Sequence, residues 1–130
     1  EEHEFFISLQ ERLVGGLGLP YHVLEVCTGD MGFGDMRQVD IETWMPGEQR
    51  YRETNSASNT GDYQSRGLSI KFKRANTEKN EYVHTLNGTA FAIGRILIAI
   101  IENYQTLEGG IRIPEVLQKY VGFSEIPPKK

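Results

Sequence analysis

Glu53 and Ser56 are the first candidates for chemistry, because a carboxylate and a hydroxyl lie three residues apart where a strand-like segment, 51–58, turns polar. Both groups present hard oxygen atoms, which suit Mg²⁺ when it is bound together with substrate phosphates. Strict strand alternation puts Glu53 and Asn55 on one face, so Ser56 joins Glu53 only if the strand bends or bulges. Spacing alone therefore favours a solvated strand end over a metal site.

Arg95 is the second candidate, because it lies inside a strongly apolar segment, 89–105, for which the sequence predicts a helix. Seven large apolar side chains leave this helix without a polar face, so we expect it to be buried. They are Phe91, Ile93, Ile96, Leu97, Ile98, Ile100 and Ile101. A buried guanidinium requires an anion, because an unpaired buried charge is strongly unfavourable. Two interpretations stay open: a structural pair with a carboxylate of the protein, or an anionic ligand.

Asn87, Gly88 and Thr89 are predicted to form a glycine turn and the beginning of that helix. The first backbone N–H groups of a helix are unpaired, and the helix dipole is positive there, so such a position favours anions. The side chains of Asn87 and Thr89 could also hydrogen-bond a small polar ligand and reject an analogue that lacks its hydroxyl. The three residues thus mark a possible binding site for a small polar molecule.

The charge of the chain is unevenly distributed. Its 130 residues carry a net charge of −4, with 4 basic and 12 acidic side chains in residues 1–62 but 10 basic and 6 acidic ones in 63–130. Neither half contains a basic block that would grip nucleic acid without specificity. Lys71, Lys73 and Arg74 alternate along a predicted strand, and a solvated face that discourages edge pairing is favoured there over a nucleic-acid groove.

Composition excludes several other classes of protein. A single cysteine, Cys27, rules out an internal disulfide and fits a reducing compartment. The three histidines are scattered and form no cysteine–histidine metal spacing. The apolar run 90–101 is too short to cross a membrane, which takes ~20 apolar residues. We therefore expect one compact domain, or a piece of a larger one, without a membrane span.

Hydrophobic periodicity predicts an α+β fold, a mostly antiparallel sheet with packed helices. Strands are expected in the middle of the chain and helices toward its ends. The expected helices cover 2–14, ended by Gly15 and Gly16, one turn at 62–67, the long helix 89–105 and a short helix opened by Pro114. The expected strands cover 21–27, 39–45, 51–58, 68–74 and 82–86. The long helix should lie across one face of the sheet.

A set of short motifs makes the chain recognisable. In order they are CTGD at 27–30, DIETWMP at 40–46, YRE at 51–53, SASN at 56–59, DYQSR at 62–66, HTLNGT at 84–89, GR at 94–95, ENY at 102–104 and RIPE at 112–115. Together they resemble seryl-tRNA synthetase in order and spacing, over residues 17–122. The glycine–arginine pair with the following helix is similar to motif 3 of class II synthetases.

This resemblance implies an enzyme core that activates L-serine with ATP and Mg²⁺ and transfers it to tRNA(Ser). The resemblance assigns Glu53 and Ser56 to Mg²⁺–ATP, with Thr54 and Asn55 in the same ATP-contacting strand. The motif 3 arginine, which meets the nucleotide, corresponds to Arg95. The resemblance assigns serine recognition to Asn87 and Thr89, the latter through the substrate hydroxyl. Positioning and charge neutralisation would then drive the reaction without a protein nucleophile.

The chain also departs from the family pattern. Motif 1, motif 2, the serine-ammonium carboxylates and the tRNA-binding arm are missing from these 130 residues. We therefore interpret residues 1–122 as the C-terminal half of a class II synthetase catalytic domain and 123–130 as a tail, and we expect the isolated chain to be inactive. The complete protein is expected to be a cytoplasmic homodimer.

Two other functions compete with this interpretation. A synthetase-like ligase could load an amino acid onto a carrier protein, and would lack the tRNA-binding arm. Alternatively, a non-catalytic binding module could keep the fold, and it would be recognised by loss of Arg95, Glu53 or Thr89. Because all three residues are present, the sequence counts against the second alternative.

Overall fold

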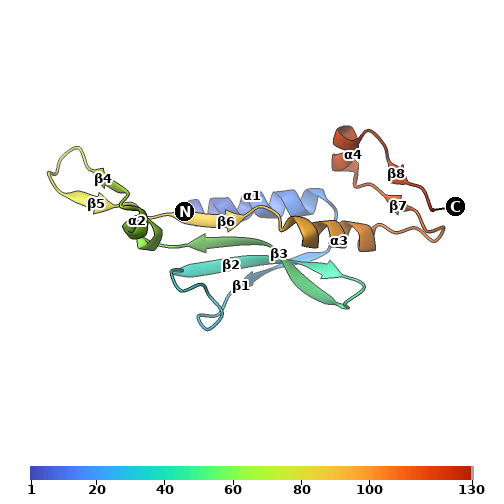
Figure 1. Ribbon diagram of the computed structural model, residues 1–130, viewed down its shortest axis with the longest axis horizontal. Coiled ribbons are helices and arrows are strands. Elements are labelled where there is room, and N and C mark those ends of the chain that lie inside the picture. Colours follow the sequence, from blue (N-terminus) through green and yellow to red (C-terminus); the bar gives the residue numbers. More distant parts are fainter. Residues whose placement is uncertain (130) are drawn as a thin grey trace.

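The computed structural model describes residues 1–129 and confirms the predicted α+β fold (Figure 1). The helices are α1 (Glu2–Gly16), α2 (Tyr63–Leu68), α3 (Ile93–Asn103) and α4 (Glu115–Val121). The strands are β1 (Tyr21–Glu25), β2 (Arg37–Met45), β3 (Arg50–Asn59), β4 (Lys71–Lys73), β5 (Asn80–Tyr82), β6 (Leu86–Thr89), β7 (Ile111–Arg112) and β8 (Glu125–Ile126). Within this part of the chain, no helix is long and apolar enough to cross a membrane.

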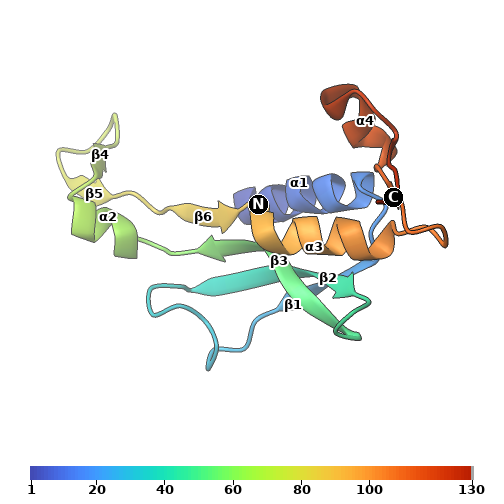
Figure 2. The same cartoon turned by 45° about the vertical axis from the view of Figure 1, so that its right-hand side comes forward.

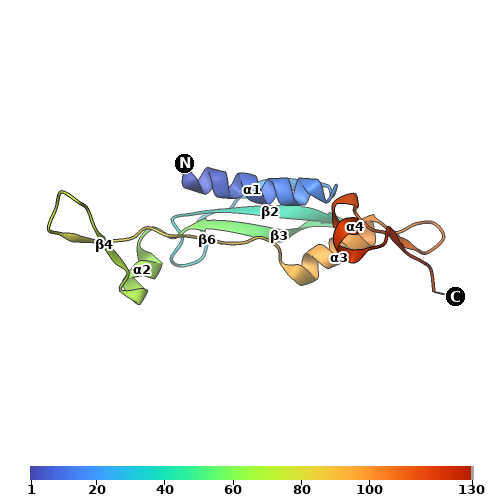
Figure 3. The same ribbon diagram turned by 90° about the horizontal axis from the view of Figure 1, so that it is seen from above.

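A four-stranded antiparallel sheet in the order β1-β2-β3-β6 forms the centre of the molecule. Strand β2 alternates as the sequence predicts, with Val39, Ile41, Thr43 and Met45 buried and the residues between them partly exposed. The buried side chains face the helices. Figure 3 shows α1 lying along the sheet and α3 beside one end of it.

Two apolar clusters hold the helices on this buried face. Near the N-terminus of α1, Ile7 packs with Val39 and Ala57 of the sheet. At the other end of the sheet, Met45 packs with α3 and with the segment that follows α1, in a cluster of Leu17, Leu19, Met45, Ile96, Ala99 and Ile100. Burial of these apolar side chains is the main force that fixes both helices against β2 and β3.

A β-bulge interrupts the pairing of β2 with β3. Ile41 pairs with Asn55, but the next residue of β2, Glu42, pairs with Glu53, so Thr54 is the extra residue. Thr54 and Asn55 are consecutive and both fully buried, which an uninterrupted strand does not allow. The bulge therefore changes the phase of alternation, and Glu53 and Ser56 lie on the same face although they are three residues apart.

The prediction that Asn87, Gly88 and Thr89 form a turn and the start of a helix is wrong. All three residues belong to β6, where Gly88 pairs with Ala57 and Thr89 with Ser56. Helix α3 begins four residues later, after Ala92. A Cβ atom at Gly88 would lie 2.5 Å from the carbonyl oxygen of Ser56. Glycine is therefore required at this position by the close approach of two strands, not by a turn.

The prediction that the long helix is buried on all sides is also wrong. In α3 only Ile96, Ala99 and Ile100 are buried, because one side of the helix meets the sheet. The other large apolar side chains of this helix are exposed, and they are Ile93, Leu97, Ile98 and Ile101. Periodicity correctly predicted the existence of the helix, but an all-apolar sequence did not show which side is covered.

Smaller elements at the two ends differ from the predictions mainly in length. Helix α1 includes Gly15 and Gly16 and ends where Gly18 adopts a positive φ of 69°. The predicted strand 68–74 shortens to β4, and 82–86 divides between β5 and β6. Strands β4 and β5 form a hairpin that projects from one end of the molecule, and β7, β8 and α4 form the other end (Figure 2).

Candidate functional site

The face of the main sheet opposite the apolar clusters, called the open face below, brings together most of the predicted site residues. Cross-strand partners share a face, so Ser56 lies beside Asp40 and Thr89, Glu53 lies beside Glu42, and Asn87 lies beside Ser58. Residues 87 and 89 are two apart in β6, which puts their side chains on one face. The open face thus carries Asp40, Glu42, Glu53, Ser56, Ser58, Asn87 and Thr89 from three strands.

Arg95 reaches this face from the first turn of α3. Its Nη1 donates to the Glu53 carboxylate Oε2 and to the Glu53 backbone carbonyl oxygen, both at 2.9 Å. The side chains are 45% and 40% exposed, so the expectation of a buried guanidinium is wrong. Of the two interpretations that the sequence left open, the structure contains the first, a pair between Arg95 and a carboxylate of the protein. The two residues line a pocket of about 330 Å³ with Glu42, Arg50, Tyr51 and Arg52.

The side chains of Thr54 and Asn55 lie on the opposite face from Glu53 and Ser56. The Thr54 hydroxyl is 2.7 Å from that of Thr43, and the Thr54 carbonyl accepts a 2.7 Å hydrogen bond from the N–H of Ala92. Asn55 donates from Nδ2 to the carbonyl of Ala90. These contacts fix the segment between β6 and α3, so the two buried residues position the first turn that carries Arg95.

Asp40 and Glu42 are open-face residues that the sequence analysis did not select. Burial raises the pKa of the Asp40 carboxyl, and the nearby charges of Glu53 and Glu42 raise it further. Pro46 and Gly47, residue types typical of a turn, lie between β2 and β3, and this signal could have identified Asp40 and Glu42 as neighbours of Glu53 and Ser56. Asp40 and Glu42 therefore add two carboxyl groups to the open face beside that of Glu53.

The oxygen atoms of this face fit a metal held jointly with phosphates. Within residues 1–129 no group of three or more histidine, cysteine, aspartate or glutamate side chains is arranged to hold a metal. Glu53 and Ser56 contribute one carboxylate and one hydroxyl to the same face, and Mg²⁺ commonly takes one or two protein ligands and completes its shell with phosphates and water. The side chains present fit that mode of binding.

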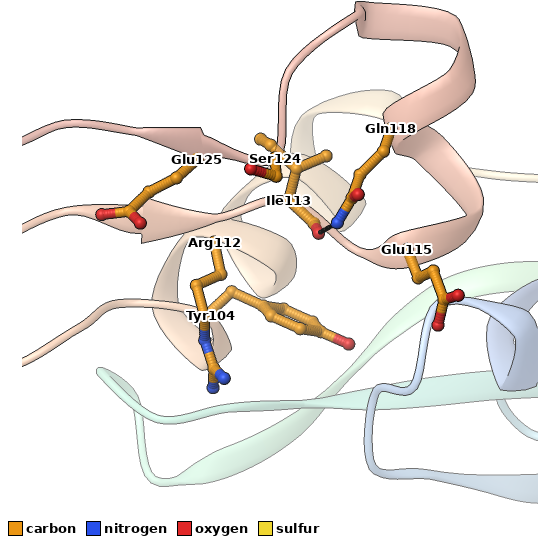
Figure 4. Close-up of a pocket in the computed structure, with 7 residues that line it drawn as sticks. All are labelled: Tyr104, Arg112, Ile113, Glu115, Gln118, Ser124 and Glu125. Carbon is orange, nitrogen blue, oxygen red and sulfur yellow. Dashed lines mark hydrogen bonds between the residues drawn. The ribbon is translucent and has the colours of Figure 1, made fainter.

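A second pocket, of about 400 Å³, lies at the end of the molecule formed by β7, β8 and α4 (Figure 4). Figure 4 shows Tyr104 and Arg112 on one side of it and Glu125 and Gln118 on the other. Gln118 donates a 3.0 Å hydrogen bond to the carbonyl of Ile113, and the Tyr104 hydroxyl donates to the carbonyl of Leu17. None of the predicted site residues lines this pocket, and these two contacts join the C-terminal elements to each other and to the loop after α1.

Comparison with known proteins gives a consistent result at the level of sequence. Residues 1–104 match the family model described as tRNA synthetase class II core domain (G, H, P, S and T). The chain is 54% identical over all 130 residues to the serine–tRNA ligase of Dictyoglomus thermophilum, of which it covers 30%. It is 50% identical over 128 residues to the serine–tRNA ligase of Pyrococcus horikoshii, covering 98% of this chain and 28% of that protein.

Solved structures agree with the sequence comparisons. The crystal structure of seryl-tRNA synthetase from Pyrococcus horikoshii complexed with ATP matches 98% of this chain with a TM-score of 0.94 and 49% identity, over 29% of that protein. Cytoplasmic serine–tRNA ligase from Naegleria fowleri in complex with AMP matches 99% of this chain with a TM-score of 0.91 and 37% identity, over 31% of its own length. The chain spans about 30% of the length of the curated relatives it matches.

Proposed function

This chain belongs to the tRNA synthetase class II core family, and from that membership we propose that it is part of an enzyme that activates L-serine with ATP and transfers it to tRNA(Ser). The observation that carries the proposal is the open face: Glu53, Ser56, Asn87 and Thr89 share it, and Arg95 reaches its edge. Residues 1–122 would form part of the catalytic domain, with motif 3 at Gly94 and Arg95.

Glu53 and Ser56 would hold Mg²⁺ together with the phosphates of ATP. The bulge at Thr54 supports this assignment, because it brings the carboxylate and the hydroxyl to one face. When bound, the metal supplies charge neutralisation and a fixed orientation of the phosphates. The protein's own part is to hold both oxygen ligands on a rigid pair of strands.

Arg95 would bind the nucleotide as a phosphate partner. The guanidinium is half exposed and bonds to a single flexible carboxylate and one carbonyl, so it is free to exchange these contacts for those of a ligand. A planar guanidinium is well suited to phosphate oxygens. Thr54 and Asn55, proposed to belong to the ATP-binding strand, would act by fixing residues 90–92 and hence the start of α3.

Asn87 and Thr89 would recognise serine. Both side chains project from β6 on the open face, one on each side of Gly88. A hydroxyl such as that of Thr89 can read the substrate hydroxyl, and a site built to bond a hydroxyl strongly rejects the analogue that lacks it. Alanine, the deoxy analogue of serine, is therefore the expected excluded substrate.

The full-length gene product is proposed to be a cytoplasmic homodimer, and the 130-residue chain to be inactive by itself. Both statements are inferred from the membership of the family. A relative with the same fold carries the description cytoplasmic in its name.

ATP–pyrophosphate exchange, with serine or alanine and without amino acid, tests the proposal on the full-length gene product and on the 130-residue chain. We expect serine-dependent exchange by the full-length protein, none with alanine and none by the chain alone. Thr89→Val should lose exchange, whereas Thr89→Ser, which keeps the hydroxyl, should retain it. Absence of serine-dependent exchange in the full-length protein would overturn the proposed function and favour carrier-protein loading or a binding role.

A further inference from the structure

The β4–β5 hairpin carries a cluster of cations that the proposed active site does not use. Residues 63–85, which comprise α2 and the hairpin, contain five basic and two acidic side chains, whereas the whole chain has a net charge of −4. The hairpin projects beyond the sheet at the end of the molecule opposite α4 (Figure 1). All three residues of β4 are exposed.

The charges of the hairpin are separated onto its two faces. Lys71 pairs across the hairpin with Tyr82, and Lys73 pairs with Asn80, so one face presents the two lysines and an aromatic ring. We call this the lysine face. Arg74 lies on the other face with Glu81, to which it forms a 3.2 Å ion pair. Within residues 1–129, Lys71 and Lys73 have no carboxylate within salt-bridge distance.

An aromatic ring lies among these cations. The Lys71 Nζ and the Arg66 guanidinium carbon each lie 4.8 Å from the centre of the Tyr82 ring. Cations next to an aromatic ring are the combination with which proteins bind the backbone and the unstacked bases of single-stranded nucleic acid. Two lysines without carboxylate partners can bind phosphates without first breaking an ion pair.

The base of the hairpin is fixed firmly to the rest of the structure. The fully buried Ser65 of α2 donates a 2.6 Å hydrogen bond to the carbonyl of Val83, and its own carbonyl accepts one from the N–H of Ile70. Strand β6 begins only four residues after Tyr82. The hairpin therefore leaves the sheet at the end of the open face where Asn87 lies, the end proposed to recognise serine.

We propose that the lysine face binds phosphates of the tRNA close to the 3′ end that receives serine. This inference rests on the proposed function, because a 3′ hydroxyl must reach an activated serine held near Asn87 and Thr89. An RNA strand that approached the Asn87 end of the open face would pass the hairpin. The negative charge of the RNA is complementary to the lysine face. The contact is with phosphates and without base specificity, since lysine is a point charge.

The test compares Lys71→Gln/Lys73→Gln with the unchanged full-length protein in binding a tRNA(Ser) transcript at several salt concentrations. Loss of two phosphate contacts should make the slope of log Kd against log salt shallower by about 1.5 to 2. Relative to 1 M salt, where counterion release contributes nothing, this change in slope corresponds to about 30- to 100-fold weaker binding at 0.1 M. Serine-dependent ATP–pyrophosphate exchange should be unchanged, since it requires no RNA.

Lys119→Gln is the matched control, because Lys119 also lies 4.8 Å from an aromatic ring, that of Tyr120, but at the other end of the molecule. It should leave both slope and affinity unchanged. If the double variant binds the tRNA with the affinity and salt slope of the unchanged protein, the inference is overturned, whatever the exchange assay shows. Absence of serine-dependent exchange in the unchanged full-length protein would instead refute the proposed function. The binding comparison would still decide the role of the hairpin.

Discussion

Replacing Arg95 by methionine separates the two interpretations of this residue, a structural partner of Glu53 or a partner of the nucleotide. The Arg95–Glu53 pair is about half exposed on both sides, with a single guanidinium nitrogen serving the carboxylate and the carbonyl at 2.9 Å. Pairs of this exposure contribute about 0.2–1 kcal/mol to stability. We therefore expect Arg95→Met to lower the free energy of unfolding by no more than about 1 kcal/mol.

The expected effect on nucleotide binding is larger. A hydrogen bond to a charged group contributes about 1.5–3 kcal/mol, so losing the contact of Arg95 with a phosphate should weaken Mg²⁺–ATP binding about 10- to 150-fold. Arg95→Lys keeps the charge but loses the planar guanidinium. Its affinity for Mg²⁺–ATP should therefore lie between that of the unchanged protein and that of Arg95→Met. Urea unfolding and isothermal titration with ATP at fixed Mg²⁺, both on the full-length protein, give the two quantities.

Arg74→Met provides the control, because Arg74 forms an ion pair of similar exposure with Glu81 far from the open face. It should change neither ATP affinity nor stability by more than about 1 kcal/mol. A loss of more than about 3 kcal/mol of stability in Arg95→Met, with ATP affinity unchanged, would refute the reasoning, because a structural role alone would then account for the residue.

Two further predictions concern the sheet itself. Gly88→Ala should lower the free energy of unfolding by about 1–3 kcal/mol in urea titrations, because its Cβ would lie 2.5 Å from the Ser56 carbonyl oxygen and 2.6 Å from the Phe6 ring. Gly67→Ala, which meets open space, should stay within about 1 kcal/mol of the parent, and an equal loss in both variants would contradict the steric explanation. Burial raises the pKa of Asp40, so this carboxyl favours folding below its unfolded-state pKa, and that contribution is lost as pH rises through the folded-state value. Asp40→Asn should therefore raise the free energy of unfolding at pH 7 but not below about pH 4, and a gain of equal size at both pH values would contradict the assignment.

The sequence predicted those features that depend on neighbours close along the chain. Strand β2 was recognised because one of its faces meets apolar helices and the other does not, which produces a local alternation. The pair Pro46 and Gly47 likewise marks the turn between β2 and β3 by residue type alone. The bulge could be stated only as a condition, because the extra residue, Thr54, is defined by its pairing with another strand.

Features set by distant partners were missed. Thr89 was assigned to a helix because an apolar run follows it, but pairing with Ser56, more than thirty residues earlier, holds it in a strand. The exposure of Arg95 was missed for a similar reason, since composition shows that α3 is apolar but not which side meets the sheet. The structure brings Glu53, Ser56, Asn87 and Thr89 onto one face. Only the resemblance had grouped them, because a resemblance carries tertiary information that periodicity lacks.

The bulge at Thr54 has a consequence for how the length of this protein can change during evolution. Deleting Thr54 would restore uninterrupted pairing and leave Glu53 opposite Glu42 on the open face, but it would remove the carbonyl that accepts the hydrogen bond of Ala92 before α3. Deleting a paired residue of β3 would instead shift its register and exchange the faces of the residues on one side of the deletion. By contrast, residues 74–79 connect β4 and β5 outside the main sheet, and an insertion there leaves the alternation of β2, β3 and β6 unchanged. We expect related chains to vary in length at the hairpin tip and to keep the residue count of β3 fixed.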